Sequence, residues 1–409
     1  MNRLALRLQS CLISIALAIS ASRAQSQSYL FVWAGGNDGS EFVATIDARP
    51  ASATYGRVLA SALTGTTGIP HHSELSLGPG GHLLANDFHA GKTWLFDLHE
   101  PLHPRILTSF GDVAGYSHPH SFLRLPNGRV LSTFQYRATG DSTMHMASMP
   151  SHVTGGLVEM NERGHPYITG SAADTTIPDR LLYPYSVLPI PTLNRAISTT
   201  TDMDHADTVA TSEWIQLWRL SDLTLLRSVA LPPGPRGDEN KFSGEPRLLA
   251  DGRSIYVHTF SCGLYLLRNI EKDTPSATLV KTFDGDECGV PILTGHYWIQ
   301  PVPALHGVVA LDVRDPQHPR EVSRAEVGSE EFPHWISIDR TGRRIVLNSG
   351  GSGSRLFILD FDPATGRLSV DEHVRDLGSD RAGISLTGPN WPGGHQGKIV
   401  PHGAVFSTR

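Results

Sequence analysis

Histidine residues stand just before an alternating apolar stretch at three places in the sequence. Alternation of apolar and polar residues predicts a strand, so the same imidazole chemistry recurs at the same phase of three strands. The three runs are His71-His72-Ser73-Glu74-Leu75-Ser76-Leu77, His120-Ser121-Phe122-Leu123-Arg124-Leu125 and Pro401-His402-Gly403-Ala404-Val405-Phe406. Equivalent strands of a closed repeat would bring these residues to one axis, and clustered imidazoles are common ligands of copper, zinc or iron. We therefore expect a metal site built from His71, His72, His120 and His402.

Further polar residues are candidates for the same site. His118, His334 and His296 stand near similar positions and could be ligands or groups that orient ligands. Glu245 opens its own unit, where it is either a carboxylate ligand, a general base or a buried turn acid. For any single histidine the alternative is that it caps a turn or bonds a carbonyl oxygen.

Other motifs are weaker. The segment 201–207 is rich in oxygen ligands but lacks the Gly and terminal Glu of an EF-hand loop. Met144, Met146 and Met149 surround His145, which indicates either a copper-handling loop or hydrophobic packing. The sequence has no Gly-x-Ser-x-Gly, Gly-rich phosphate loop or Cys-x-x-Cys motif, which disfavours serine hydrolase and nucleotide chemistry.

A repeated unit must position these residues. Each copy has a polar or aromatic leading residue, an alternating apolar run, a turn that usually contains Gly, and a second apolar strand. The leading positions are 72, 120, 185, 245, 296, 334 and 402, with spacings of 38 to 68 residues. This count and average spacing predict an all-β, seven-bladed β-propeller. We expect the strand-rich stretch 29–47 to pair with the C-terminal blade and close the ring, and the stretches 140–185 and 232–243 to form long loops.

The N-terminal segment and the net charge indicate where the protein is located and which partners are disfavoured. Arg3 and Arg7 precede an apolar run from Cys11 to Ala21, which predicts a signal peptide over residues 1–24 and a single propeller domain over 25–409. We expect a periplasmic or secreted protein with no membrane span. Residues 1–24 hold three Arg and no acid, so their removal leaves 31 basic and 40 acidic residues, which disfavours nucleic-acid binding. The sequence does not indicate an oligomeric state.

Two cysteines, Cys262 and Cys288, remain after the predicted cleavage. Export makes a disulfide between them possible, and the alternatives are two free buried thiols or thiolate ligands of a metal.

The chain resembles the selenium-binding protein and methanethiol oxidase family. The matching segments are Ala44-Thr45-Ile46-Asp47, Tyr55-Gly56-Arg57-Val58, His71-His72-Ser73, Pro119-His120-Ser121 and Pro401-His402-Gly403. The resemblance implies a seven-bladed propeller and a copper centre held by His71, His72, His120 and His402. It also implies oxidation of a small thiol by dioxygen to an aldehyde, hydrogen sulfide and hydrogen peroxide, with Glu245 as our candidate base. Family members commonly carry a cysteine tied to selenium binding after the paired histidines; residues 75–79 have none, so selenium binding is not expected.

Two other classes of function remain open on the sequence. One is a non-enzymatic propeller that binds a partner through its loops. The other is a propeller lactonase or other hydrolase that uses calcium or zinc at the same axis. The identity of the metal would separate them from a copper oxidase.

Overall fold

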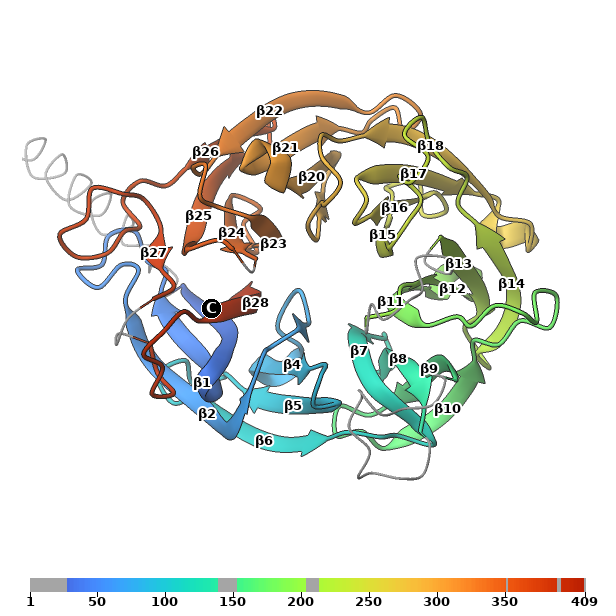
Figure 1. The fold of residues 1–409 in the computed structure, drawn as a ribbon, viewed down its shortest axis with the longest axis horizontal. Helices are drawn as coiled ribbons and strands as arrows, with labels where there is room; N and C mark the ends of the chain where they lie inside the picture. Colours follow the sequence, from blue (N-terminus) through green and yellow to red (C-terminus); the bar gives the residue numbers. More distant parts are fainter. Residues whose placement is uncertain (1–27, 139–152, 204–212, 351, 388–390, 408–409) are drawn as a thin grey trace, which may run out of the picture.

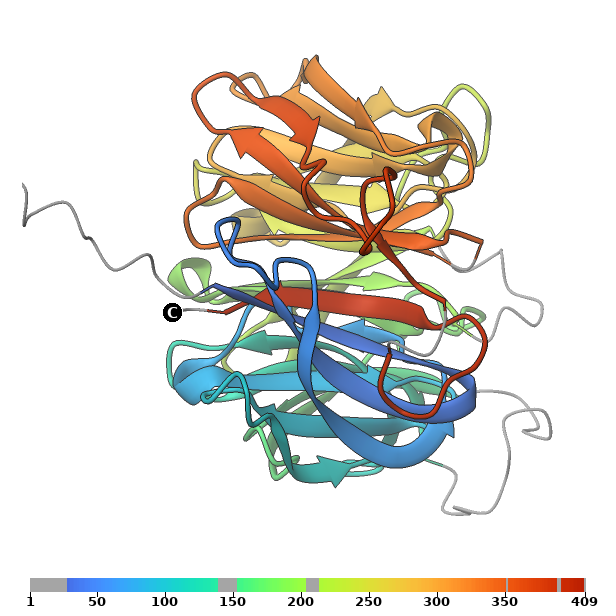
Figure 2. The same ribbon diagram turned by 90° about the vertical axis from the view of Figure 1, so that its left-hand side faces the viewer.

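The strands form a closed ring of seven antiparallel sheets around one axis. The structure, a computed structural model, describes residues 28–138, 153–203, 213–350, 352–387 and 391–407. Figure 1 looks down the axis and shows the seven sheets as blades, and Figure 2 shows the ring from its side. Blades one to six each run in chain order from an innermost to an outermost strand. The seven-bladed β-propeller predicted from the repeat is confirmed.

Alternating apolar residues and Gly-containing turns set the strand bounds. Blade one contains β3 (His72–Ser73), β4 (His82–Asp87), β5 (Lys92–Asp97) and β6 (Arg105–Phe110). Blade two contains β7 (Tyr116–Arg124), β8 (Val130–Arg137), β9 (Thr154–Met160) and β10 (Pro166–Ser171). Blade three contains β11 (Pro184–Ile190), β12 (Arg195–Thr200), β13 (Trp214–Arg219) and β14 (Thr224–Ala230).

The next three blades repeat this arrangement. Blade four contains β15 (Ser243–Leu248), β16 (Ile255–Thr259), β17 (Gly263–Arg268) and β18 (Ser276–Thr282). Blade five contains β19 (Ile292–Thr294), β20 (Tyr297–Val302), β21 (Gly307–Asp312) and β22 (Arg320–Glu326). Blade six contains β23 (Pro333–Ile338), β24 (Arg344–Ser349), β25 (Arg355–Asp362) and β26 (Arg367–Val370), and β27 (Ile384–Ser385) also pairs with β25. In the part of the chain that the structure describes, short 3₁₀ turns lie at Pro79–Gly81, Pro191–Leu193, Ile270–Lys272 and Pro303–Leu305.

Blade seven joins the two ends of the described chain. Its innermost strand is β28 (Val400–Phe406), which pairs with β1 (Tyr29–Asp47), and β1 in turn pairs with β2 (Val58–Gly68). In Figure 1 the red β28 lies against the blue β1. The register sets Leu30 opposite Phe406 and Trp33 opposite Gly403. The predicted closure by the stretch 29–47 is confirmed, and it removes the open edges that a linear array would leave.

The core lies between the blades. In the described part of the chain, a separate apolar cluster fills each interface between neighbouring blades. At the closure, for example, Trp33 of β1 packs on Trp94 of β5 with ring centroids 5.6 Å apart. Each blade therefore depends on both neighbours for burial of its faces.

Two sequence expectations need correction. Residue 296 does not open the fifth blade: His296 lies in the turn between β19 and β20, where its ring packs on Tyr297. The innermost strand is the three-residue β19 just before it, which is too short to show an alternating pattern. The stretch 140–185 is not one long loop, because it contains β9 and β10. The predicted signal peptide, the methionines around His145 and residues 204–207 of the oxygen-rich segment lie outside the described residues.

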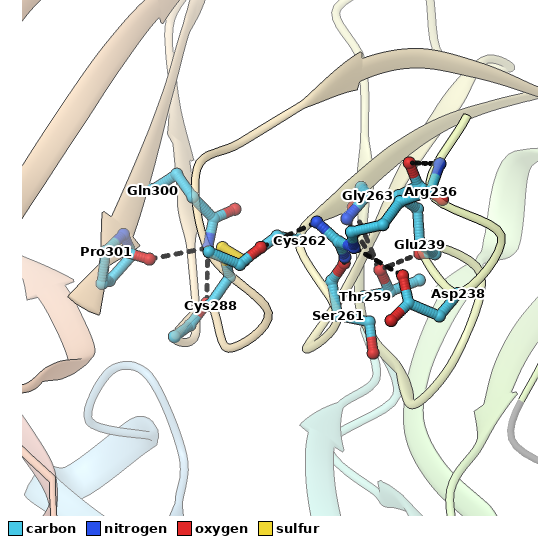
Figure 3. Close-up of a disulfide and its surroundings, with 12 residues drawn as sticks. Arg236, Asp238, Glu239, Thr259, Ser261, Cys262, Gly263, Cys288, Gln300 and Pro301 are labelled. Carbon is cyan, nitrogen blue, oxygen red and sulfur yellow. Dashed lines mark hydrogen bonds and ion pairs between the residues drawn. A yellow bond between two sulfur atoms is a disulfide. The ribbon is translucent and has the colours of Figure 1, made fainter. Parts of the chain in front are cut away.

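The two remaining cysteines form a disulfide that joins neighbouring blades. Cys262 lies in the turn between β16 and β17 and Cys288 in the loop before β19, with their Cα atoms 5.1 Å apart (Figure 3). Both cysteines are buried, and because their sulfur atoms are bonded to each other they are neither free thiols nor metal ligands. Arg236 braces the same region, donating hydrogen bonds to the carbonyl oxygens of Ser261 and Gly285. No helix among the described residues has the length and apolar character needed to cross a membrane.

Candidate metal centre

The innermost strands present their leading residues through β-bulges. In blades two, three, four, six and seven the pairing of the innermost strand with its neighbour shifts by one residue. The residues at these shifts include His120, Tyr185, Glu245, His334 and His402. A bulge adds one residue to one strand and re-aims its side chain, and bulges are common beside functional sites.

Proline favours this local structure. Each innermost strand is an edge strand of its blade, which is where a residue without a backbone N–H is tolerated. A proline stands directly before four of the leading residues, as Pro119, Pro184, Pro333 and Pro401. The Pro-His or Pro-Tyr pair therefore marks the place where the innermost strand bulges.

Three histidines from blades one and two gather at the axis. One ligand atom from each of His71, His72 and His120 lies within 4.8 Å of the others. The ring centroids of His71 and His72 lie 4.8 and 4.7 Å from that of His120. Of the six predicted ligands, these three form the tight group.

The hydrogen bonds of these rings leave nitrogen atoms available. Nδ1 of His120 bonds the carbonyl oxygen of Tyr185 at 2.7 Å, so Nδ1 carries the proton and Nε2 is left with a lone pair. That Nε2 is buried without a partner, as are Nδ1 of His71 and Nδ1 of His72. Unpaired buried nitrogens cost free energy unless a ligand satisfies them.

Burial keeps the imidazoles neutral. It holds the pKa of His71 and His120 well below the usual range, and the other histidines of the group add to the effect. Burial also lowers the pKa of His72 to about 3, and the positive charge of Arg247 lowers it further. Neutral imidazole is the form that binds metals, so these ligands are ready at neutral pH.

His402 lies beside this group and bonds to His334. Its ring centroid is 4.6 Å from that of His71, and its Nε2 lies 2.7 Å from Nε2 of His334. One of these two nitrogens donates and the other accepts. Nδ1 of His402 is buried without a partner. His402 can therefore offer a fourth nitrogen while His334 orients it.

His118 lies outside the group of three. Its backbone φ of 57° breaks the strand alternation that would place it on the same side as His120. Its ring packs against Phe88 and Tyr136, with centroids 5.4 and 5.2 Å away. Phe88 also contacts His71, with centroids 5.6 Å apart, so one phenyl ring touches both His118 and a member of the group.

Glu245 lies next to His72 in the buried channel. Its Oε1 is 3.8 Å from Nε2 of His72 and has no hydrogen-bond partner. Its Oε2 accepts hydrogen bonds from Ser186 and Arg247, each at 2.8 Å. Glu245 thus has one occupied oxygen and one that faces a candidate ligand.

Two residues that the sequence analysis missed hold this arrangement. Asn86 accepts a hydrogen bond from the backbone of His72 and donates one to the carbonyl oxygen of Pro119. His258 accepts a hydrogen bond from the backbone of Glu245 at 2.8 Å, and burial lowers its pKa to about 3. His258 is the last residue but one of β16, the strand beside β15, so its position next to a leading residue could have been predicted from antiparallel pairing.

A cavity of about 390 Å³ borders the histidines. His71, His334 and His402 form one part of its lining. The other lining residues are Tyr185, Thr201, Met203, Phe242, Phe260, Asp286 and Glu287. A small molecule in this cavity would contact both the imidazoles and an aromatic wall.

The sequence is similar to two curated enzymes. A methanethiol oxidase of Hyphomicrobium sp is 24% identical over 353 residues, which are 79% of this chain and 75% of the relative. A methanethiol oxidase of Ruegeria pomeroyi is 29% identical over 115 residues, 26% of each chain. No family model matches the sequence. The two relatives confirm the resemblance to the selenium-binding protein and methanethiol oxidase family.

Solved structures share the fold. A hypothetical selenium-binding protein from Sulfolobus tokodaii has a TM-score of 0.71 at 14% identity, covering 94% of each chain. A periplasmic gluconolactonase of Pseudomonas aeruginosa has a TM-score of 0.60 at 15% identity, covering 94% of this chain and 99% of the other. At these identities the likeness shows the propeller fold alone.

Proposed function

We propose that this protein is a copper-dependent oxidase of a small thiol, with the metal held by His71, His72, His120 and His402. The observation that carries the proposal is the group of three imidazoles with buried, unpartnered nitrogens beside a cavity. Nitrogen ligands suit copper, zinc and iron, and a sulfur-containing substrate favours copper among them. The two curated relatives named methanethiol oxidase support a thiol substrate, with methanethiol as the best single choice.

The proposed reaction converts the thiol, dioxygen and water into an aldehyde, hydrogen sulfide and hydrogen peroxide. The thiol carbon is oxidised, dioxygen is reduced by two electrons, and water supplies the aldehyde oxygen. Bound copper supplies a redox-active site that accepts a thiolate sulfur.

The chain's own residues position the substrate and move protons. Tyr185 and Phe260 line the cavity and exclude water from the alkyl group. His334 holds His402 in place through the bond between their Nε2 atoms. The base role of Glu245 stays a prediction: its free Oε1 faces Nε2 of His72 at 3.8 Å, where a proton could be received through one water.

Metal analysis tests the proposal. We expect about one copper per chain in the protein grown with copper and zinc, and its loss from the His71→Ala/His72→Ala variant. An exposed-histidine variant, His373→Ala, is the control and should keep the metal. If the His71→Ala/His72→Ala variant loses copper, the next experiment is an assay of thiol-dependent oxygen consumption by both proteins. Absence of any metal from the parent protein would reject the oxidase and favour a binding propeller, and calcium or zinc would favour a hydrolase.

We also propose that the protein is exported to a periplasm or secreted. The disulfide between Cys262 and Cys288 supports this location, because such bonds persist in oxidising compartments. Cell fractionation with intact-mass analysis tests it: the periplasmic or secreted form should lack residues 1–24. A full-length protein found in the cytoplasm would contradict export.

A further inference from the structure

Two adjacent acidic residues stand at the rim of the cavity. Asp286 and Glu287 belong to the loop between β18 and β19, and both are exposed, whereas the histidines at the other part of the lining are partly buried. Phe260 and Phe242 lie in the same lining. The lining of the cavity therefore combines negative charge, aromatic rings and imidazoles, and the ring of Phe260 stacks on that of His334 with centroids 6.4 Å apart.

The structure leaves these carboxylates without a positive partner. Within the described residues, neither forms an ion pair with an Arg or Lys side chain. Arg236 donates to the carbonyl oxygen of Gly285, next to Asp286, but its charge is paired with Asp238 at 2.6 Å. Arg247 bonds Glu245 and the carbonyl oxygen of Pro291. Loss of water around its carboxylate at the cavity rim raises the pKa of Glu287, although the residue as a whole is exposed, and the negative charge of Asp286 raises it further.

The acidic loop is held in a fixed place. The disulfide ties Cys288, the residue after Glu287, to Cys262, and the backbone N–H of Cys288 donates to the carbonyl oxygen of Phe260 at 2.7 Å. Figure 3 shows the disulfide between Cys262 and Cys288. The backbone N–H of Val290 donates to the carbonyl oxygen of His334. The acids are thus fixed relative to both an aromatic wall and a histidine of the site, which lowers the entropy cost of binding.

The cavity is larger than a one-carbon thiol requires. Methanethiol has two non-hydrogen atoms and fills the space of roughly two to three waters, at about 30 Å³ each in the liquid. The cavity of about 390 Å³ holds several times that volume. A substrate that fills it needs a longer body between its sulfur and any second recognised group.

We propose that the cavity binds a small primary aminothiol, with its sulfur toward the histidines and its ammonium group between Asp286 and Glu287. This inference rests on the proposed thiol oxidase function. Opposite charge and the aromatic side chains of Phe260 and Phe242 in the same lining both favour an ammonium ion here. In the corresponding reaction, aminothiol, dioxygen and water give the amino-aldehyde, hydrogen sulfide and hydrogen peroxide, and the ammonium group is unchanged.

A binding experiment with two unreactive probes tests the charge preference. The probes are 2-(methylthio)ethylamine, which is cationic, and methyl propyl sulfide, its neutral counterpart of the same length. Neither is a thiol, so neither can be turned over. We expect ligand-observed NMR titration to give about tenfold tighter binding of the cationic probe to the parent protein, and less than a twofold preference in Asp286→Asn/Glu287→Gln.

A charge-matched control separates local from general electrostatics. The variant Glu100→Gln/Glu372→Gln removes two exposed acids elsewhere and should keep the tenfold preference. Equal binding of both probes to the parent protein would overturn the inference, and so would an unchanged preference in Asp286→Asn/Glu287→Gln. Loss of copper from that variant would also overturn it, because the acids would then serve the metal.

Failure of the inference differs from failure of the proposed function. Methanethiol-dependent oxygen consumption without a preference for the cationic probe would keep the oxidase and reject the aminothiol. A clear preference without oxygen consumption on any thiol would keep a cation-selective cavity and reject the oxidase.

Discussion

The side-chain oxygen of Asn86 accepts a hydrogen bond from the backbone N–H of His72 at 2.7 Å. The amide nitrogen of the same side chain donates to the carbonyl oxygen of Pro119, the residue before His120. Asn86 thereby ties the innermost strands of blades one and two together at the level of the histidines. The spacing of His72 and His120 depends on this one buried side chain.

Replacing Asn86 with Ala should therefore weaken copper binding without removing a ligand. We expect a 10- to 100-fold rise in the dissociation constant for copper, as is usual when a group that orients ligands is lost. Competition with a chelator of known affinity measures the change. The control is Asn127→Ala, in an exposed turn of blade two, which should bind copper as the parent does. Equal affinity of a natively folded Asn86→Ala variant would contradict the bridging role.

Glu245→Gln tests the base. Gln keeps the shape of the side chain but removes the proton-accepting oxygen near His72, so kcat should fall about 100-fold or more while the copper content stays the same. Ser186→Ala removes only one hydrogen bond to Glu245, worth about 1 kcal/mol, and should lower kcat less than tenfold. If the Gln variant keeps full activity and the parent's pH profile, Glu245 has only a structural role.

Stability of the metal-free protein should fall as pH decreases below about 6.5. Burial lowers the pKa of His72 and His258 to about 3 and of His334 to about 4 in the folded chain. Between these values and 6.5 the unfolded chain binds protons that the folded chain does not, so acid favours unfolding. Each such histidine lowers the free energy of unfolding by up to about 1.4 kcal/mol per pH unit.

Urea denaturation at pH 7.5, 6 and 5 with a chelator present measures this dependence. His258→Gln should show a shallower loss of stability than the parent, because one buried histidine no longer titrates. His373→Gln, at an exposed position, should follow the parent. If the free energy of unfolding depends on pH equally in all three proteins, His258 is not a buried neutral histidine.

Removing the disulfide should loosen the acidic loop. Cys262 and Cys288 are 26 residues apart, and a cross-link over that length restrains the unfolded chain by about 3 kcal/mol. Cys262→Ser/Cys288→Ser should lose about that much stability in urea denaturation and should bind the cationic probe more weakly. Its copper content should match the parent, since neither sulfur is a ligand. Loss of copper would indicate that the loop supports the metal site directly.

The sequence pattern predicted the ring because its signal is local and repeated. Six of the seven leading positions mark innermost strands, since an alternating run follows each of them. The seventh leading position, His296, was wrong because the innermost strand β19 has only three residues. Such a short strand shows no alternating pattern, and His296 is the polar residue nearest to it. Proline before His120, His334 and His402 was a further local signal, and it coincides with the bulges.

What could not be predicted depends on contacts between distant segments. The bond between His334 and His402 joins residues 68 apart in sequence, and only the closed ring brings them together. The partners of Asn86 lie on two blades. Asp286 and Glu287 belong to a loop, so no alternating strand pattern in the sequence marks them. The disulfide and the backbone hydrogen bonds of the loop place them at the cavity.

Closure of the ring by β28 also sets when the site can exist during synthesis. His71, His72 and His120 emerge early from the ribosome, whereas His402 enters after the other six innermost strands. A nascent or truncated chain that lacks β28 has no seventh blade and one wall fewer around the histidines. The last wall of the cavity therefore forms only when β28 pairs with β1, two strands from opposite ends of the described chain.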